Sequence, residues 1–179
     1  APLLLLAACS STPPPPDWQM NAKGSLERAT DAYLSGDDRV GAAEFARARA
    51  ELARTGRADW VARAELTRCA AQVASLVFDD CPGFAALAQD ASAEQRAYAE
   101  YLAGRGTAQS SALLPAAQRE FAVSTPSADA LARIDDPLSR LVAAGVYPPV
   151  VAGGPLQRRL GMAADQDGDG RGGGRADLD

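Results

Sequence analysis

The sequence predicts an all-α protein built from antiparallel helix hairpins, with disordered ends. Its 179 residues include 40 Ala and 17 Arg, which favour helices, whereas only 6% of the residues are aromatic. Apolar side chains recur three and four residues apart from Trp18 to about Val146, which is the spacing of amphipathic helices. No segment is convincing as a strand, so the sequence favours a purely helical fold.

The first predicted helix runs from Asn21 or Ser25 to Leu34, and the second covers residues 39–54. Ser25 is a candidate N-cap of the first helix, and Ser35-Gly36-Asp37-Asp38 ends it. Gly56 is the expected C-terminal stop of the second helix. The apolar positions of that second helix recur at helical spacing: Ala42, Phe45, Ala48 and Leu52.

A third helix is predicted from residue 58 to Phe78, before the break Asp79-Asp80-Cys81-Pro82-Gly83. Its apolar stripe consists of Leu66, Ala70, Val73 and Val77. A fourth helix is predicted over residues 93–102, with Ser92 at its start and Gly104 just after its end. Weaker helical patterns follow in two segments, residues 113–123 and 128–144, and Asp136-Pro137 interrupts the second of them.

Helices joined by turns this short must pack their apolar faces on one another, which predicts a small bundle or a short array of hairpins. The spacing of Ala29, Tyr33 and Gly36, followed by Ala43 and Arg47, resembles the helix hairpins of tetratricopeptide repeats. The Trp-Leu-Gly-Tyr order of that family is absent, and its period of about 34 residues does not return later in the chain. A generic helical bundle is therefore the alternative.

An apolar segment leads directly into the first cysteine. Residues 1–8 are too few to span a bilayer, which takes about 20 apolar residues, but they suit the end of a secretory signal peptide. The tetrad Leu6-Ala7-Ala8-Cys9 resembles the lipobox of bacterial lipoproteins. The resemblance implies cleavage before Cys9 and a diacylglyceryl lipid on its thiol. Ser10 then implies delivery to the periplasmic face of the outer membrane. The alternative is an uncleaved tail with an incidental cysteine.

These features predict four parts in the chain. A signal-peptide remnant, residues 1–8, is followed by a Ser/Pro-rich tether, residues 9–17. The helical periplasmic domain covers residues 18–146. Residues 147–179 form a Gly/Asp/Arg-rich tail that is either disordered or an out-of-frame translation.

Two cysteines remain once Cys9 carries the lipid. In an oxidising periplasm, this even remainder predicts one disulfide, between Cys69 and Cys81. The bridge requires the chain to reverse sharply after Phe78, because a disulfide joins Cα atoms only about 6 Å apart. The alternative is a pair of reduced, buried thiols.

The composition of the chain excludes several kinds of catalytic and binding site. The chain contains no histidine, which excludes Ser-His-Asp triads, Cys-His dyads and histidine zinc sites. A net charge of −5 argues against a nucleic-acid binder. The pairs Asp37-Asp38, Asp79-Asp80 and Asp135-Asp136 stand at predicted turns, where capping is their ordinary role.

One segment copies the start of a calcium loop and then departs from it. Asp165-x-Asp167-x-Asp169-Gly170 has the expected opening, but position 12 is Ala176 rather than a bidentate Glu. The sequence therefore predicts no catalytic residue, no metal site and no cofactor.

The functional expectation is a lipid-anchored protein whose helical domain binds a protein partner or serves as an envelope scaffold. Its partners would be the membrane, through the lipid on Cys9, and a protein of the envelope. The alternative is a cell-wall enzyme that cleaves glycan with a helical Glu, although no Glu is followed by Ser as in lytic transglycosylases. A Glu buried in a deep cleft would favour the enzyme, whereas an open groove lined by Arg, Tyr and Ala would favour the scaffold.

Overall fold

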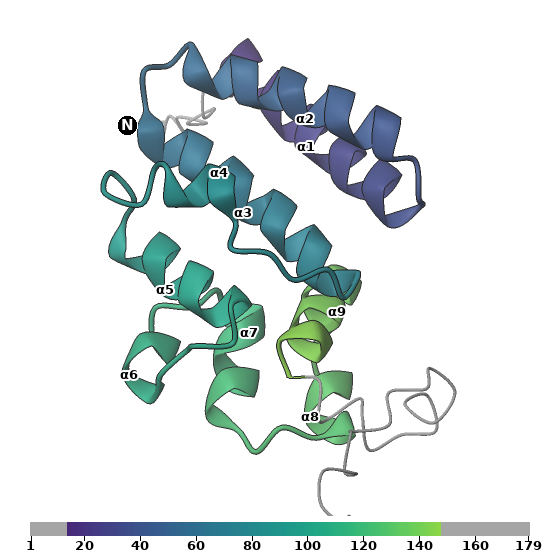
Figure 1. Ribbon diagram of the computed structural model, residues 1–179, viewed down its shortest axis with the longest axis vertical. Helices are drawn as coiled ribbons and strands as arrows, with labels where there is room; N and C mark the ends of the chain where they lie inside the picture. Colours follow the sequence, from purple (N-terminus) through teal and green to yellow (C-terminus); the bar gives the residue numbers. More distant parts are fainter. Residues whose placement is uncertain (1–13, 148–179) are drawn as a thin grey trace, which may run out of the picture.

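The computed structural model describes residues 14–147, and within them the protein is all-helical, as predicted. In Figure 1 the hairpin of α1 (Asp17–Leu34) and α2 (Asp38–Ala53) lies on one side of α3 (Ala58–Ala74), and most of the shorter helices lie on the other. Cys9 and the calcium-loop-like residues 165–170 lie outside the described residues.

The α1–α2 hairpin begins earlier than predicted and turns where predicted. α1 starts at Asp17, directly after Pro16, which is extended with φ −62° and ψ 149° and whose carbonyl accepts from the Gln19 N–H. Ser25 is therefore not an N-cap but a buried residue inside α1. Gly36, with φ +82°, ends α1, and the Asp37 carboxylate accepts from the Val40 N–H to start α2.

α3 ends at Ala74, so the prediction of a helix that continues to Phe78 is wrong. Leu76 adopts a left-handed conformation with φ 60°, and its N–H bonds the Val73 carbonyl while the Val77 N–H bonds that of Gln72. This pattern of two bonds closes a helix and usually carries glycine at the left-handed position. Val77 is consequently exposed and does not extend the apolar stripe.

The C-terminal half contains six short helices among the described residues. α5 (Ala93–Leu102) has the predicted bounds and a capping box between Ser92 and Gln95. The one-turn helices α4 (Pro82–Ala85) and α6 (Ala108–Ser111) were not predicted. α7 (Ala116–Val123) starts three residues later than expected, after Pro115. The predicted segment 128–144 is two helices, α8 (Ala128–Ala132) and α9 (Pro137–Val146).

α3 is the central element of the core. One of its faces packs against the hairpin through Val61 and Ala64, in a small cluster that includes Phe45. Its opposite face contributes Leu66, Ala70 and Val73 to a larger cluster with α5 and α9. The largest fully buried side chains all belong to that second half: Tyr101, Phe121, Leu114 and Val142. The hairpin therefore rests on a thinner, Ala-rich contact than the rest of the fold.

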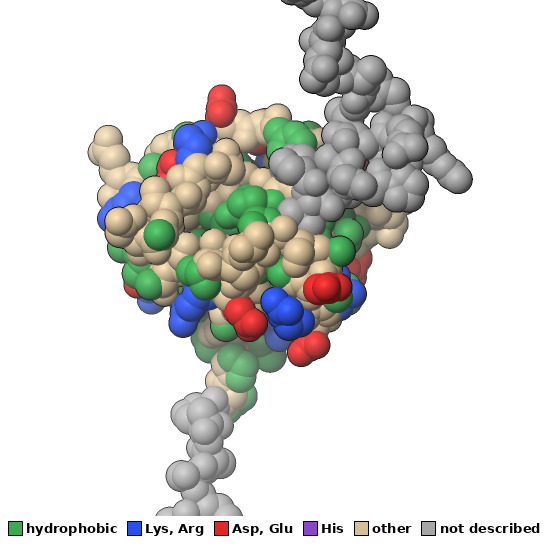
Figure 2. Space-filling view, turned by 90° about the horizontal axis from the view of Figure 1, so that it is seen from below, with side chains coloured by type: hydrophobic (Ala, Val, Ile, Leu, Met, Phe, Trp, Pro, Cys, Tyr) green, Lys and Arg blue, Asp and Glu red, His purple; other side chains and the backbone are tan. Residues whose placement is uncertain are grey.

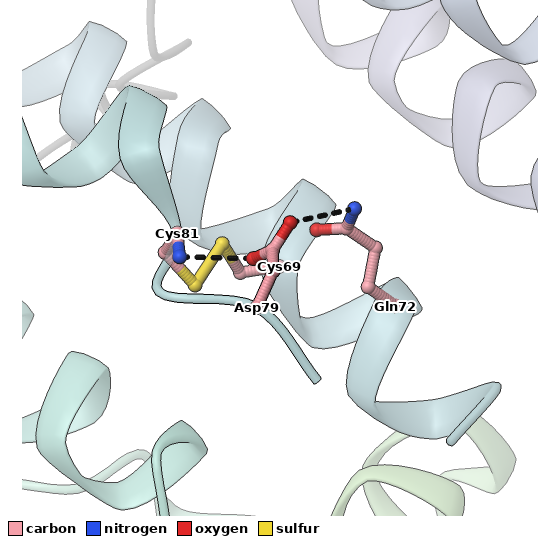
Figure 3. The surroundings of a disulfide bond; sticks show 4 residues. All are labelled: Cys69, Gln72, Asp79 and Cys81. Carbon is pink, nitrogen blue, oxygen red and sulfur yellow. Dashed lines mark hydrogen bonds between the residues drawn. A yellow bond between two sulfur atoms is a disulfide. The ribbon is translucent and has the colours of Figure 1, made fainter. Parts of the chain in front are cut away.

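The predicted disulfide joins Cys69 of α3 to Cys81, with Cα atoms 5.8 Å apart (Figure 3). Asp79 accepts hydrogen bonds from the Cys81 N–H, at 2.9 Å, and from the Gln72 side chain, at 3.3 Å. The chain reverses at Leu76 rather than after Phe78, which brings Cys81 back alongside α3.

The described residues carry charges of both signs. They contain fourteen Lys and Arg and eighteen Asp and Glu. On the face shown in Figure 2, apolar side chains gather near the centre and charged side chains of both signs lie toward the margins. Among the described residues, no helix is both long and apolar enough to cross a bilayer.

Candidate binding groove

An open groove of about 590 Å³ lies between the α1–α2 hairpin and α3. We call it the hairpin groove, and the side chains that characterise it are Leu26, Ala29, Tyr33, Ala42, Phe45, Ala46, Arg49, Arg68 and Ala71. The floor is apolar, because Ala29, Phe45 and Ala71 are buried there. Arginine and tyrosine side chains lie among the exposed alanines of the margin.

Two buried carboxylates form ion pairs that connect the three helices of this groove. Glu44 of α2 accepts from Arg28 Nε of α1 at 3.0 Å and from Arg47 at 2.5 Å. Glu65 of α3 accepts from Arg49 Nε of α2 at 2.9 Å. The first ion pair ties α1 to α2 and the second ties α2 to α3.

The Glu65 carboxylate is enclosed from two sides. The side chain is only 7% exposed, with Arg49 on one side and α4 on the other. A Cβ added at Gly83 of α4 would collide with the Glu65 carboxylate. Glu65 is therefore a packed structural acid at the edge of the groove, not a carboxylate that stands free in a cleft.

The Arg28 hydrogen bond holds the pKa of Glu44 below its ordinary value of 4.5, and burial opposes it with a smaller effect. Glu44 is thus an ionised carboxylate at neutral pH.

A pH dependence follows from this lowered pKa. Because the folded pKa lies below the unfolded one, ionised Glu44 stabilises the fold above about pH 4.5, and this contribution is lost as the pH falls through the folded pKa. We expect Glu44→Gln to lower the urea midpoint at pH 7 and to flatten its decline below pH 4.5. The measurement is a series of urea midpoints from pH 3 to pH 7.

The matched control for this series is Glu27→Gln. Glu27 is an exposed acid of α1 whose oxygen is 3.8 Å from Lys23 Nζ. An identical pH profile for wild type and Glu44→Gln would contradict the assigned role of Glu44.

Arg68 is the cation of the hairpin groove that is available to bind a ligand. Its guanidinium lies 5.1 Å above the centre of the Phe45 ring, and it makes no ion pair among residues 14–147. The side chain is exposed at the margin of an apolar floor. An anionic group entering the groove would meet it directly.

A second groove, of about 660 Å³, lies on the other side of Leu26 and Thr67, which line both grooves. Trp18 and Trp60 line it and meet edge to face, with ring centres 5.8 Å apart. They are the two tryptophans of the whole chain. Their fluorescence is consequently a built-in reporter of how the hairpin sits on α3.

The cysteines and the turn aspartates that the sequence singled out lie outside the hairpin groove, except Asp38, which lines it. Cys69 and Cys81 are beyond the lining of the hairpin groove, near its Gln72 end. Their sulfurs and the Asp79 carboxylate come within 4.8 Å of one another, but the sulfurs are bonded to each other and are not free to bind a metal. Asp37 and Asp136 cap α2 and α9, as expected of turn aspartates.

The burial of Glu44 and Glu65 was not predicted from the sequence. A signal was nevertheless present, because Arg28 precedes Glu44 by 16 residues and Arg49 precedes Glu65 by the same number. The helices α1, α2 and α3 follow one another and are similar in length. A constant spacing of 16 residues therefore places each Arg and its Glu on neighbouring helices.

Comparison with known proteins identified no relative of this chain. The chain matches no family model, and neither the curated proteins nor the solved structures compared with it yield a match, so its function must be argued from the groove itself.

Proposed function

We propose that the protein is a lipid-anchored lipoprotein on the periplasmic face of the outer membrane, whose helical domain binds a segment of a partner protein in the hairpin groove. The anchor would be Cys9 in its lipobox, and the Ser/Pro-rich tether would separate the lipid from the domain. The observation that carries the binding role is the open groove with an apolar floor, whose margins carry Arg, Tyr and Ala together with the polar side chains Thr30, Asp38, Thr67 and Gln72.

The chemistry of the groove specifies the kind of segment that fits. Phe45 and Ala71 offer an apolar floor for an aliphatic or aromatic side chain. Arg68, already above the Phe45 ring, offers a guanidinium to a carboxylate beside that side chain. An amphipathic helix with an acidic residue next to its apolar face satisfies both requirements.

The binding role is tested by photo-crosslinking in intact envelopes. A photo-reactive amino acid at Ala42, which lines the groove, should capture a partner segment, whereas the same amino acid at Ala53, on α2 outside the groove lining, should not. We expect Arg68→Glu to reduce the capture at least tenfold, because it places a carboxylate opposite an acidic segment. Equal capture at both positions, or capture unaffected by Arg68→Glu, would contradict the proposal.

The anchor has its own test. In a Gram-negative host, a palmitate analogue should label the protein, and globomycin should block the processing that accompanies this labelling. Cys9→Ser should abolish the label. Labelling that persists in Cys9→Ser would overturn the lipid assignment while leaving the groove untouched.

The rival function is a glycan-cleaving enzyme with Glu65 as its acid, because Glu65 is buried and lines the groove. Both buried acids are engaged by arginines, and the lowered pKa of Glu44 makes it a poor proton donor. We therefore expect no soluble fragments from purified peptidoglycan incubated with the protein. Fragment release that disappears in Glu65→Gln would establish the enzyme instead.

A further inference from the structure

A second candidate surface lies just beyond the C-terminal end of α3. Leu76, Val77 and Phe78 are consecutive, and they are 52%, 46% and 59% exposed. We call these three residues the apolar knuckle. Single exposed apolar side chains are ordinary, but three in a row on one loop form a patch of the kind found where partners bind.

The knuckle is held in its exposed position by several independent contacts. Leu76, the first residue of the knuckle, and Cys81, three residues after it, are the two non-glycine residues with positive φ in the described chain. The disulfide to Cys69 closes the loop, and Asp79 accepts from Gln72 and from the Cys81 N–H (Figure 3). A loop fastened in this way loses little conformational entropy when it binds.

A groove of about 400 Å³ adjoins the knuckle. Phe78 lines it together with the apolar side chains Val73, Leu102 and Val146, and charged side chains lie in the same lining. The groove thus joins the knuckle to the ends of α3, α5 and α9. An apolar side chain from a partner would find contacts on several sides.

The charge beside this groove is acidic. Asp79 and Asp80 follow the knuckle directly and line the groove. Arg105 also lines the groove, but its guanidinium is already engaged, because it donates to both oxygens of Glu100, at 2.9 and 3.1 Å. Asp80 makes no ion pair within residues 14–147, so the surface as a whole presents negative charge next to exposed apolar side chains.

From this combination we propose that the knuckle and its groove bind a segment of a second partner protein in which an apolar side chain stands next to Lys or Arg. The apolar side chain packs against Phe78 in the groove, and the cation pairs with Asp80 and Asp79. The acidic margin disfavours an anionic lipid surface. The site goes beyond the proposed function because it lies outside the hairpin groove and selects the opposite charge.

The test uses the full chain with its disulfide intact and a library of random twelve-residue peptides displayed on phage. We expect the enriched peptides to carry Lys or Arg beside an aromatic or aliphatic residue. A synthetic copy of the most enriched peptide should bind at least tenfold more weakly to Phe78→Ser and to Asp80→Lys. Replacing its basic residue by Glu should abolish binding.

Two controls separate this site from other surfaces. Val123→Ser removes a more exposed apolar side chain, on α7, and should leave peptide binding unchanged. Arg68→Glu alters only the hairpin groove and should also leave it unchanged, so the two proposals fail independently. Circular dichroism establishes that each variant is folded.

Each of the following results would overturn the proposal. The library could yield no enriched peptide, peptides without a basic residue, or peptides that bind Phe78→Ser as well as wild type. Vesicles containing an anionic phospholipid could bind the protein through Phe78, which would make the knuckle a membrane contact. Sedimentation could reveal a dimer that Phe78→Ser dissociates, which would assign the surface to a second copy of the chain.

Discussion

Gly145→Ala should lower the free energy of unfolding by about 3 kcal/mol, at the upper end of the range for overpacked cores. Gly145 lies where α9 crosses the end of α3, and a Cβ added there would come within 2.9 Å of Val73 Cγ1 and would overlap the Val73 carbonyl oxygen. A backbone carbonyl cannot swing aside as a flexible side chain does. α9 would have to retreat, which loosens the contacts of Val142 and Val146 in the main core.

Urea unfolding of Gly145→Ala measures this effect, and two other glycines calibrate it. Gly24→Ala should raise the free energy of unfolding by about 0.5–1 kcal/mol, because alanine has the higher helix propensity. Its new methyl group meets only the flexible end of the Arg28 side chain, at 3.2 Å. The free energy of unfolding of Gly41→Ala should lie between those of the other two variants, since its methyl group would lie 3.3 Å from the Ala29 carbonyl oxygen of α1. A Gly145→Ala protein as stable as Gly24→Ala would disprove the close α3–α9 contact.

Removal of the disulfide should cost a similar amount, about 3 kcal/mol, through the double replacement Cys69→Ser/Cys81→Ser. The bridge joins residues twelve positions apart, so its loss gives the unfolded chain back the freedom of a short loop. In the folded state, loss of the bridge also releases the segment that carries Leu76 and Phe78. Amide exchange in residues 75–81 should therefore accelerate more than exchange in α5.

The measurement compares urea midpoints of the wild type and the double variant, each with and without a thiol reductant. The reductant should lower the midpoint of the wild type and leave that of the double variant unchanged. A wild-type midpoint that does not respond to complete reduction, verified by alkylation of both thiols, would show that the bridge adds no stability. The peptide-binding test should also weaken after reduction, because the knuckle loses its fixed position.

Local signals predicted the elements that carry them. α5 has the predicted bounds because Ser92 and Gln95 cap its start and Gly104 follows its end, all within a few residues of the helix they delimit. Asp37 likewise starts α2. α3 was predicted too long because its stop is Leu76, a residue type that rarely adopts a left-handed conformation.

The candidate sites depended far less on local signals. Nothing next to Glu44 or Glu65 in the sequence indicates that they are buried; their burial follows from Arg28 and Arg49 on neighbouring helices. Phe78 was expected to continue an apolar helix, and it became exposed only because the chain turns away from the core two residues earlier.

The sequence by itself determined the helical class, the α1–α2 turn, the bounds of α5 and the pair of cysteines that bond, because helix propensity, capping and the pairing of two leftover cysteines depend on residue type and short spacing. Only the tertiary structure decided which acids are buried, where the hairpin groove opens and which apolar side chains stay in solvent. Those properties arise from how distant helices pack on α3, and burial is a property of neighbours rather than of the residue itself.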